Sequence, residues 1–217
     1  MSLESPTVAI LLFDGITALD AVAPYEVLSK IPGAQVCFVS LTAGAVSCTG
    51  GLTLVADYSI EDIKEADVVV IPGGRGVNNL LNHNKLLAWV RAMHKTARYT
   101  VSVCTGSLLL GAAGLLNGLK ATSHWLHIDK LKEYGAEPAG GRYIVEGKII
   151  TSAGVSAGID MALELVRLIK NETLAKAIQL AIEYDPSPPF DAGAPHKASK
   201  ELVEMVRTAY SRNVNEK

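Results

Sequence analysis

The sequence has no excess of charge and few aromatic side chains. Its 217 residues carry 20 Lys and Arg against 22 Asp and Glu, which gives a net charge of −2 at pH 7, and only 6% of the residues are Phe, Trp or Tyr. Binding to nucleic acid or to an anionic membrane surface depends on a basic face, which this charge balance does not supply. We therefore expect a small-molecule ligand, with no nucleic acid and no membrane among the partners.

Long apolar runs and a signal-like N-terminus are also lacking. No apolar stretch reaches the ~20 residues of a membrane-spanning helix, and no basic region precedes the short apolar run in MSLESPTVAILLF. The three cysteines, Cys37, Cys48 and Cys104, are odd in number and have no CxxC spacing, so neither a disulfide framework nor a zinc site is predicted. These absences predict a cytoplasmic protein without a bound metal.

The chain does contain a regular alternation of apolar and amphipathic runs. Near-continuous apolar runs, which are typical of strands covered on both faces, lie at 7–13, 34–41, 66–74 and 98–104. Runs with apolar residues at helical spacing lie at 25–31, 86–97 and 156–170. This alternation predicts an α/β fold with a doubly wound, mostly parallel sheet sandwiched between helices.

The C-terminal third adds a hairpin and a proline-rich segment. Two short strand-like runs flank Glu146 and Gly147, which predicts a hairpin at that position. The prolines of residues 184–196 exclude a regular helix or a central strand there, and a final helix is expected over about 197–212. A chain of this length that is 49% hydrophobic can bury one core. We predict a single domain over 1–217 that ends in this segment and helix.

Cys104 lies where the strand-like run YTVSV ends and a helix-like run begins. Ligands of open α/β sheets bind at the carboxyl ends of the strands, so this turn is a candidate site. A thiol at the start of a helix would have its pKa lowered by the helix macrodipole, and Gly106 leaves room for a tight turn of the nucleophile-elbow type. The alternative is a buried cysteine that only fills a packed junction.

Two further strand-to-helix turns carry candidate residues. Asp20 comes shortly before a helix that Pro24 could open at its first position, with a helix cap as the alternative role. Gly73 and Gly74 in IPGGRG follow a buried strand and could expose backbone N–H groups towards an anion. Because these turns lie at the same edge of the predicted sheet, their residues are expected near Cys104.

The segments VVVIPGGRGV, SVCTGSLLLGAAGLLNGLKATSHW and SAGVSAGIDMALELV together resemble the ThiJ/PfpI superfamily, over nearly the whole chain. The resemblance implies a flavodoxin-like sandwich, as in class I glutamine amidotransferases, with a cysteine at a nucleophile elbow. LLFDGITALDAVAPYEVL and AIEYDPSPPFDAGAP are most similar to its isocyanide hydratase branch. Protease-like members place a histidine directly after the cysteine. Thr105 stands there in this chain, so peptidase activity is disfavoured.

The resemblance to the hydratase branch implies an enzyme without a cofactor that converts an isocyanide and water to an N-substituted formamide. Cys104 would add to the isocyanide carbon, and Asp20 would protonate the adduct and later activate water. Thr105 would orient Asp20 through its hydroxyl, while the backbone at Gly73, Gly74 and Thr105 would stabilise developing charge. Burial beside a thiolate is expected to raise the pKa of Asp20.

Other functions of the superfamily stay open. The same cysteine and acid suit a glyoxalase or deglycase. Cys104 would instead be oxidised in a redox sensor or chaperone, although those relatives carry a glutamate in place of Asp20. A small-molecule-binding regulatory module is the third alternative. His124 in ATSHW is a candidate pocket residue, with packing as its alternative role. Relatives are homodimers, so the resemblance implies a homodimer in which residues 184–196 cover the partner or the site.

Overall fold

The chain forms two compact units in the computed structural model, which describes residues 5–215, with side chains as far as residue 211. The first unit is Met1–Ile182 and the second is Glu183–Lys217. All predicted site residues belong to the first unit. Within the second, residues 184–196 have neither helix nor strand, and the terminal helix α7 spans Lys200–Asn215. That the whole chain acts as a single domain stays a prediction.

The first unit is built on a seven-stranded sheet in the order β10-β11-β7-β6-β1-β2-β5. The strands are β1 (Thr7–Leu11), β2 (Gln35–Ser40), β5 (Tyr58–Ser59), β6 (Val68–Ile71), β7 (Tyr99–Val103), β10 (Tyr143–Glu146) and β11 (Ile149–Ser152). Neighbouring strands are parallel except β10 and β11, which form an antiparallel hairpin. The predicted mostly parallel sheet and its hairpin are confirmed.

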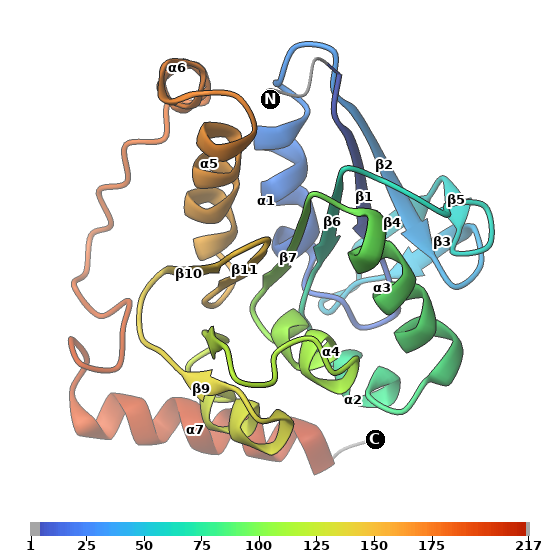
Figure 1. The fold of residues 1–217 in the computed structure, drawn as a ribbon. Helices are drawn as coiled ribbons and strands as arrows, with labels where there is room; N and C mark the ends of the chain where they lie inside the picture. The colour runs from blue at the N-terminus through green and yellow to red at the C-terminus, as the bar shows by residue number, and fades with distance from the viewer. Residues whose placement is uncertain (1–4, 216–217) are drawn as a thin grey trace. The chain divides into compact units, whose positions relative to one another are not determined.

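Helices cover both faces of this sheet (Figure 1). One face carries α1 (Ala18–Leu28) and α5 (Ala157–Ile169), with α6 (Glu172–Ala181) packed against α5, and the other carries α2 (Val77–Leu80), α3 (Asn84–Thr96) and α4 (Gly106–Ala112). This arrangement confirms the doubly wound sandwich.

The start of α1 differs from the sequence prediction. The helix begins at Ala18, so Pro24 lies inside it and does not open it. A proline inside a helix removes one backbone hydrogen bond. Here Pro24 is buried and its ring packs close to Gly158 of α5, so tertiary packing outweighs the local preference. As a result, Asp20 lies in the first turn of α1 and not ahead of the helix.

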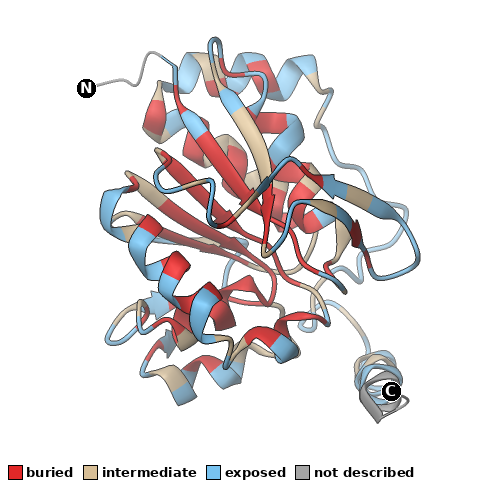
Figure 2. Cartoon of the chain, turned by 90° about the vertical axis from the view of Figure 1, so that its right-hand side faces the viewer, coloured by how far each residue is buried: buried red, intermediate tan, exposed pale blue. Residues whose placement is uncertain are grey.

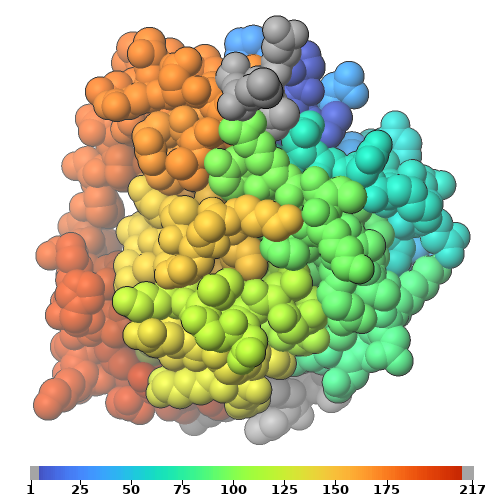
Figure 3. Space-filling model, in the orientation of Figure 1, coloured from blue at the N-terminus to red at the C-terminus, as the bar shows by residue number. Residues whose placement is uncertain are grey.

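The remaining elements were not predicted from the sequence. An antiparallel hairpin of β3 (Gly44–Ser47) and β4 (Thr53–Ala56) lies beside β2, and a short parallel pair is formed by β8 (Lys120–Ala121) and β9 (Glu137–Pro138) around the 3-10 helix η1 (Ile128–Tyr134). The segment from α4 to η1 and the hairpin β10–β11 form adjoining parts of one surface of the first unit (Figure 3).

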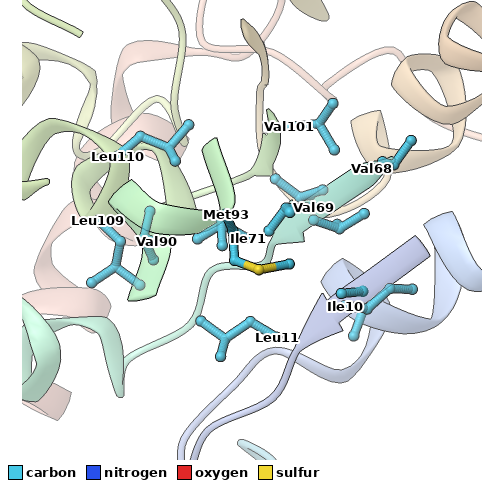
Figure 4. Packing of buried hydrophobic residues seen from close by; sticks show 14 of the residues in the cluster. Ile10, Leu11, Val68, Val69, Ile71, Val90, Met93, Val101, Leu109 and Leu110 are labelled. Carbon is cyan, nitrogen blue, oxygen red and sulfur yellow. The ribbon is translucent and has the colours of Figure 1, made fainter. Parts of the chain in front are cut away.

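The core lies on both faces of the central strands. Burial follows the sheet, and α3 is buried on one side, whereas α4 is buried along nearly its whole length (Figure 2). Side chains of β1, β6 and β7 meet those of α3 and α4, among them Ile10, Ile71, Met93, Leu109 and Leu110, all fully buried (Figure 4). The sheet is therefore a close-packed support for the turns at its carboxyl edge. None of the described helices combines the length and hydropathy of a membrane-spanning segment.

Candidate active site

Cys104 lies at a sharp turn between β7 and α4. Its φ is 58°, in the left-handed region that non-glycine residues seldom adopt. The Cys104 N–H donates to the carbonyl oxygens of Ser152 and Ala153, both at 3.1 Å. A Cβ on Gly106 would lie 2.0 Å from the carbonyl oxygen of Ile71, so only glycine fits there. Backbone strain of this kind persists where the surroundings fix it, and it is common at functional sites.

Asp20 lies next to Cys104 and is fully buried. Its Oδ2 accepts a hydrogen bond of 3.0 Å from the Gly73 N–H, and its carboxyl also has a hydrogen bond with the Cys104 thiol. Burial raises the pKa of Asp20 to about 7, while these two hydrogen bonds act in the opposite direction. Among the described residues, Oδ1 has no hydrogen-bond partner. Asp20 can therefore gain or lose a proton near neutral pH.

Gly73 and Thr105 bring the turn after β6 against the turn after β7. A Cβ on Gly73 would lie 2.5 Å from the Thr105 nitrogen and 2.9 Å from Asp20 Oδ2, so glycine is required for this close approach. The Gly74 N–H donates to Thr105 Oγ1 at 2.9 Å, and that hydroxyl donates back to the Gly74 carbonyl at 3.3 Å.

These contacts show a structural role of Gly73 and Gly74 that the sequence did not indicate. The N–H groups of Gly73 and Gly74 hold the side chains of Asp20 and Thr105, and the hydrogen bonds of the Thr105 hydroxyl go to Gly74. The Gly73 N–H therefore orients the carboxyl of Asp20. A charge-stabilising role for the two glycines, and a catalytic role for Thr105, stay predictions.

The electrostatics of the Cys104 thiol differ from the sequence expectation. Burial raises its pKa above the ordinary value, and the negative charge of Asp20 raises it further. The backbone N–H groups of Thr105 and Val155 bond to the sulfur and lower the pKa, but they do not outweigh burial. The prediction that the helix macrodipole would lower the pKa of this thiol was wrong, because α4 is short and Cys104 is only 5% exposed.

Val155 was missed in the sequence. It contributes a backbone N–H, which every residue type except proline carries, so no side-chain signal could have identified it. Its φ of 41° is unusual for a β-branched residue and makes it a second strained position at this site. The ring of His124 lies against Gly154, the residue that precedes Val155. Burial and the nearby His127 lower the pKa of His124 to about 4, so its imidazole is neutral at pH 7.

A separate cavity of about 420 Å³ lies beside β1 and β2 and contains none of the predicted site residues. Cys37 and Asp57 are among the residues that line it. Burial, followed by the charge of Asp57, raises the pKa of the Cys37 thiol, which makes it a poor nucleophile. Within residues 5–215, no three His, Cys, Asp or Glu side chains are grouped as metal ligands would be.

A doubly wound α/β unit with a cysteine at a strained strand-to-helix turn and a buried acid beside it defines a class of nucleophile-elbow proteins. Within that class, the chain belongs to the DJ-1/PfpI family, whose sequence pattern matches residues 6–168. The resemblance drawn from the motifs is thus confirmed.

Three known proteins illustrate the relationship. The chain is 41% identical over 200 residues to the isonitrile hydratase of Pseudomonas putida, covering 92% of this chain and 88% of that protein. It is 26% identical over 155 residues to the glutathione-independent glyoxalase DJR-1.2 of Caenorhabditis elegans, covering 69% and 83%. The crystal structure of a ThiJ/PfpI family protein from Pseudomonas syringae matches with a TM-score of 0.93 at 34% identity, over 97% of this chain and 88% of that one.

Proposed function

We propose that the protein is an isocyanide hydratase, a lyase that adds water to an isocyanide and releases an N-substituted formamide. The observation that carries this proposal is the buried Asp20–Cys104 pair, in which a carboxyl with a pKa of about 7 lies against a cysteine at a strained turn. The identity to the Pseudomonas putida isonitrile hydratase, which extends over most of both chains, supports the same reaction.

In the first step, the Cys104 sulfur adds to the terminal carbon of the isocyanide. The thiol proton passes to the Asp20 carboxylate as the carbon–sulfur bond forms, and Asp20 then delivers that proton to the same carbon. The product is a thioimidate, in which carbon is bonded to sulfur, hydrogen and a doubly bonded nitrogen. The N–H groups of Thr105 and Val155 stabilise the negative charge that develops on sulfur during the transfer.

In the second step, water adds to the thioimidate carbon. Asp20, ionised again, accepts a proton from the attacking water and passes it to the nitrogen, which gives a tetrahedral carbon bearing hydroxyl, amine and sulfur. The carbon–sulfur bond then breaks and the hydroxyl proton returns through Asp20 to sulfur. The formamide leaves, and both the thiol and the carboxylate are regenerated.

The test is an assay with two substrates. Purified protein is mixed with an aryl isocyanide, and formamide is followed by absorbance, with methylglyoxal in parallel. We expect formamide from the wild-type protein and none above the uncatalysed rate from Cys104→Ala. Consumption of methylglyoxal, with no formamide formed from the isocyanide, would indicate a glyoxalase in place of an isocyanide hydratase. Reactivity of Cys104 towards peroxide without turnover of either substrate would favour the redox alternative.

We further propose that the protein is a homodimer. No charged residue occurs from Leu41 to Ala56, a stretch that includes the β3–β4 hairpin. Leu52 and Val55 in this hairpin are 53% and 61% exposed. An exposed strand pair without charges tends to be covered by another chain. A second copy would cover the same surface on both subunits by a two-fold axis.

Sedimentation equilibrium at micromolar concentration tests this proposal, with Val55→Lys as the interface variant. We expect a dimer for the wild-type protein and a shift to monomer for the variant. A chain that ends at Glu183 tests whether residues 184–196 contribute. A monomeric wild-type protein would refute the proposal. The cytoplasm is the proposed compartment, because all three cysteines are free thiols, as a reducing environment would keep them.

A further inference from the structure

The loop of residues 153–156, which joins β11 to α5, supplies one of the two N–H groups at the Cys104 sulfur. The donor is Val155, whose φ of 41° is costly for a β-branched side chain. A conformation of this kind is kept only where neighbouring groups prevent the backbone from relaxing. Contacts on this loop therefore decide whether the N–H points at the sulfur.

The ring of His124 occupies the space beside Gly154. A Cβ on Gly154 would lie 2.5 Å from His124 Cδ2 and 3.3 Å from Nε2. The φ of Gly154 lies outside the left-handed region that favours glycine. The His124 ring is thus the group that excludes a side chain at residue 154.

His124 is itself fixed to the site. Its Nδ1 accepts a hydrogen bond of 3.3 Å from the Leu126 N–H, and its carbonyl accepts one of 2.8 Å from the His127 N–H. The preceding residue, Ser123, donates its hydroxyl to the Cys104 carbonyl at 3.1 Å. The segment that carries the ring is therefore attached to the same turn that carries the sulfur.

Arg142 holds the loop at other points. Its carbonyl accepts a hydrogen bond of 2.9 Å from the Ala153 N–H. Its guanidinium donates to Ser156 Oγ at 3.2 Å and to Asp160 Oδ2 at 2.7 Å. Ala153 and Ser156 are thus fixed. The carbonyls of Gly154 and Val155 accept hydrogen bonds of 3.1 and 3.2 Å from the N–H groups at the start of α5. The side chain that lies against Gly154 is the His124 ring.

We propose that His124 is a positioning residue, whose ring presses on Gly154 and keeps the Val155 N–H directed at the Cys104 sulfur. Its effect on turnover rests on the proposed function, but its effect on the reactivity of the sulfur does not. The ring acts by its shape and does not exchange a proton, because the imidazole is neutral at pH 7.

Two substitutions separate this role from local folding. His124→Ser removes the ring, while its hydroxyl can still accept the Leu126 N–H. His124→Asn keeps an oxygen where the ring has Nδ1 and an amide nitrogen where the ring has Cδ2, the atom closest to Gly154. We expect His124→Ser to slow the reaction of Cys104 with iodoacetamide by roughly tenfold, the effect of one weakened hydrogen bond to the sulfur, and His124→Asn to stay close to wild type. Mass spectrometry of peptides assigns each alkylation rate to its cysteine, and the alkylation of Cys37 in the same sample is the internal reference.

A double-mutant cycle with Gly154→Ala provides the decisive result. The new methyl group collides with the ring in the wild-type background, so Gly154→Ala alone should also slow Cys104. Combined with His124→Ser, the methyl fills part of the vacated space, so the double variant should react faster than either single variant. Gly140→Ala is the matched control, because no atom lies within 4 Å of a Cβ there. With isocyanide, kcat should follow the alkylation rates and KM should change less.

Three outcomes would overturn the proposal: independent, multiplicative effects of the two substitutions; a wild-type rate in His124→Ser; or a faster rate in His124→Ser, which would mean that the ring only shields the sulfur. Alkylation of Cys104 by iodoacetamide can be measured whether or not the protein turns over an isocyanide. If the wild-type protein releases no formamide, the proposed function fails, and the alkylation rates still decide the role of His124.

Discussion

Replacing Asp20 by Asn should abolish turnover and yet stabilise the protein at alkaline pH. The folded state raises the pKa of Asp20 from an ordinary value of 3.8 to about 7. Between these values the folded protein holds a proton that the unfolded chain has released, so stability is lost as pH rises through this window and the loss is complete above pH 7. Asn carries no titrating proton, so the variant lacks this loss.

The magnitude follows from the size of the shift. One pKa unit corresponds to about 1.4 kcal/mol, so the raised pKa of Asp20 costs the folded state roughly 4 kcal/mol at pH 8 and under half of that at pH 5. Burying an amide adds its own cost, but that cost is the same at both pH values. The stability difference between Asp20→Asn and wild type should therefore grow by roughly 3 kcal/mol from pH 5 to pH 8.

Urea unfolding at a fixed protein concentration, at several pH values from 5 to 8.5, measures this difference. Asp62→Asn is the control of opposite sign. Hydrogen bonds from Ser59 lower the pKa of the exposed Asp62, so its replacement should bring no alkaline stabilisation. A difference between Asp20→Asn and wild type that stays constant, or shrinks as pH rises, would refute the reasoning about Asp20.

Three further predictions follow from the same contacts. Cys104→Ala should remove all turnover at a stability cost of only about 1 kcal/mol, because the lost volume is small; turnover above the uncatalysed rate would remove Cys104 from the mechanism. In wild-type protein, kcat/KM should fall as pH drops through about 7, because Asp20 takes up the proton that it must accept from the thiol; a flat profile from pH 5.5 to 8.5 would contradict this. Lys148→Met should lower stability by about 1–2 kcal/mol without changing kcat, because the Lys148 ammonium donates to carbonyls at the end of α3; an unchanged unfolding midpoint would show that this cap contributes nothing.

The sheet and the position of Cys104 were predictable because they depend on local patterns. Buried strands that alternate with amphipathic helices have few alternative folds, and a residue between a strand and a helix must lie at the carboxyl edge of the sheet. The same reasoning brings Asp20 and Gly73 to that edge, where the structure places them in contact with each other.

Other features depend on packing, which a local pattern does not contain. Pro24 lies inside α1 because its ring packs against α5, and the Cys104 thiol has a raised pKa because the fold buries it beside Asp20. Val155 acts through its backbone, so its role depends on a φ angle that the residue type disfavours. The sequence therefore indicated which side chains meet and that the pKa of Asp20 is raised, but not that the pKa of the Cys104 thiol is raised as well.

The raised pKa values of both partners bear on the choice between turnover and redox sensing. A redox-sensing cysteine is typically an accessible, low-pKa thiolate, whereas Cys104 is 5% exposed and its pKa is raised. Hydration of an isocyanide needs a nucleophile and a proton for the same carbon. Near pH 7–8, Asp20 is ionised and the Cys104 thiol keeps its proton. This pair therefore holds the nucleophile and the proton in one place. A permanent thiolate beside an ionised carboxylate would have the nucleophile without the proton. The burial that makes Cys104 a poor sensor therefore suits the proposed addition, in which sulfur and proton reach the carbon together.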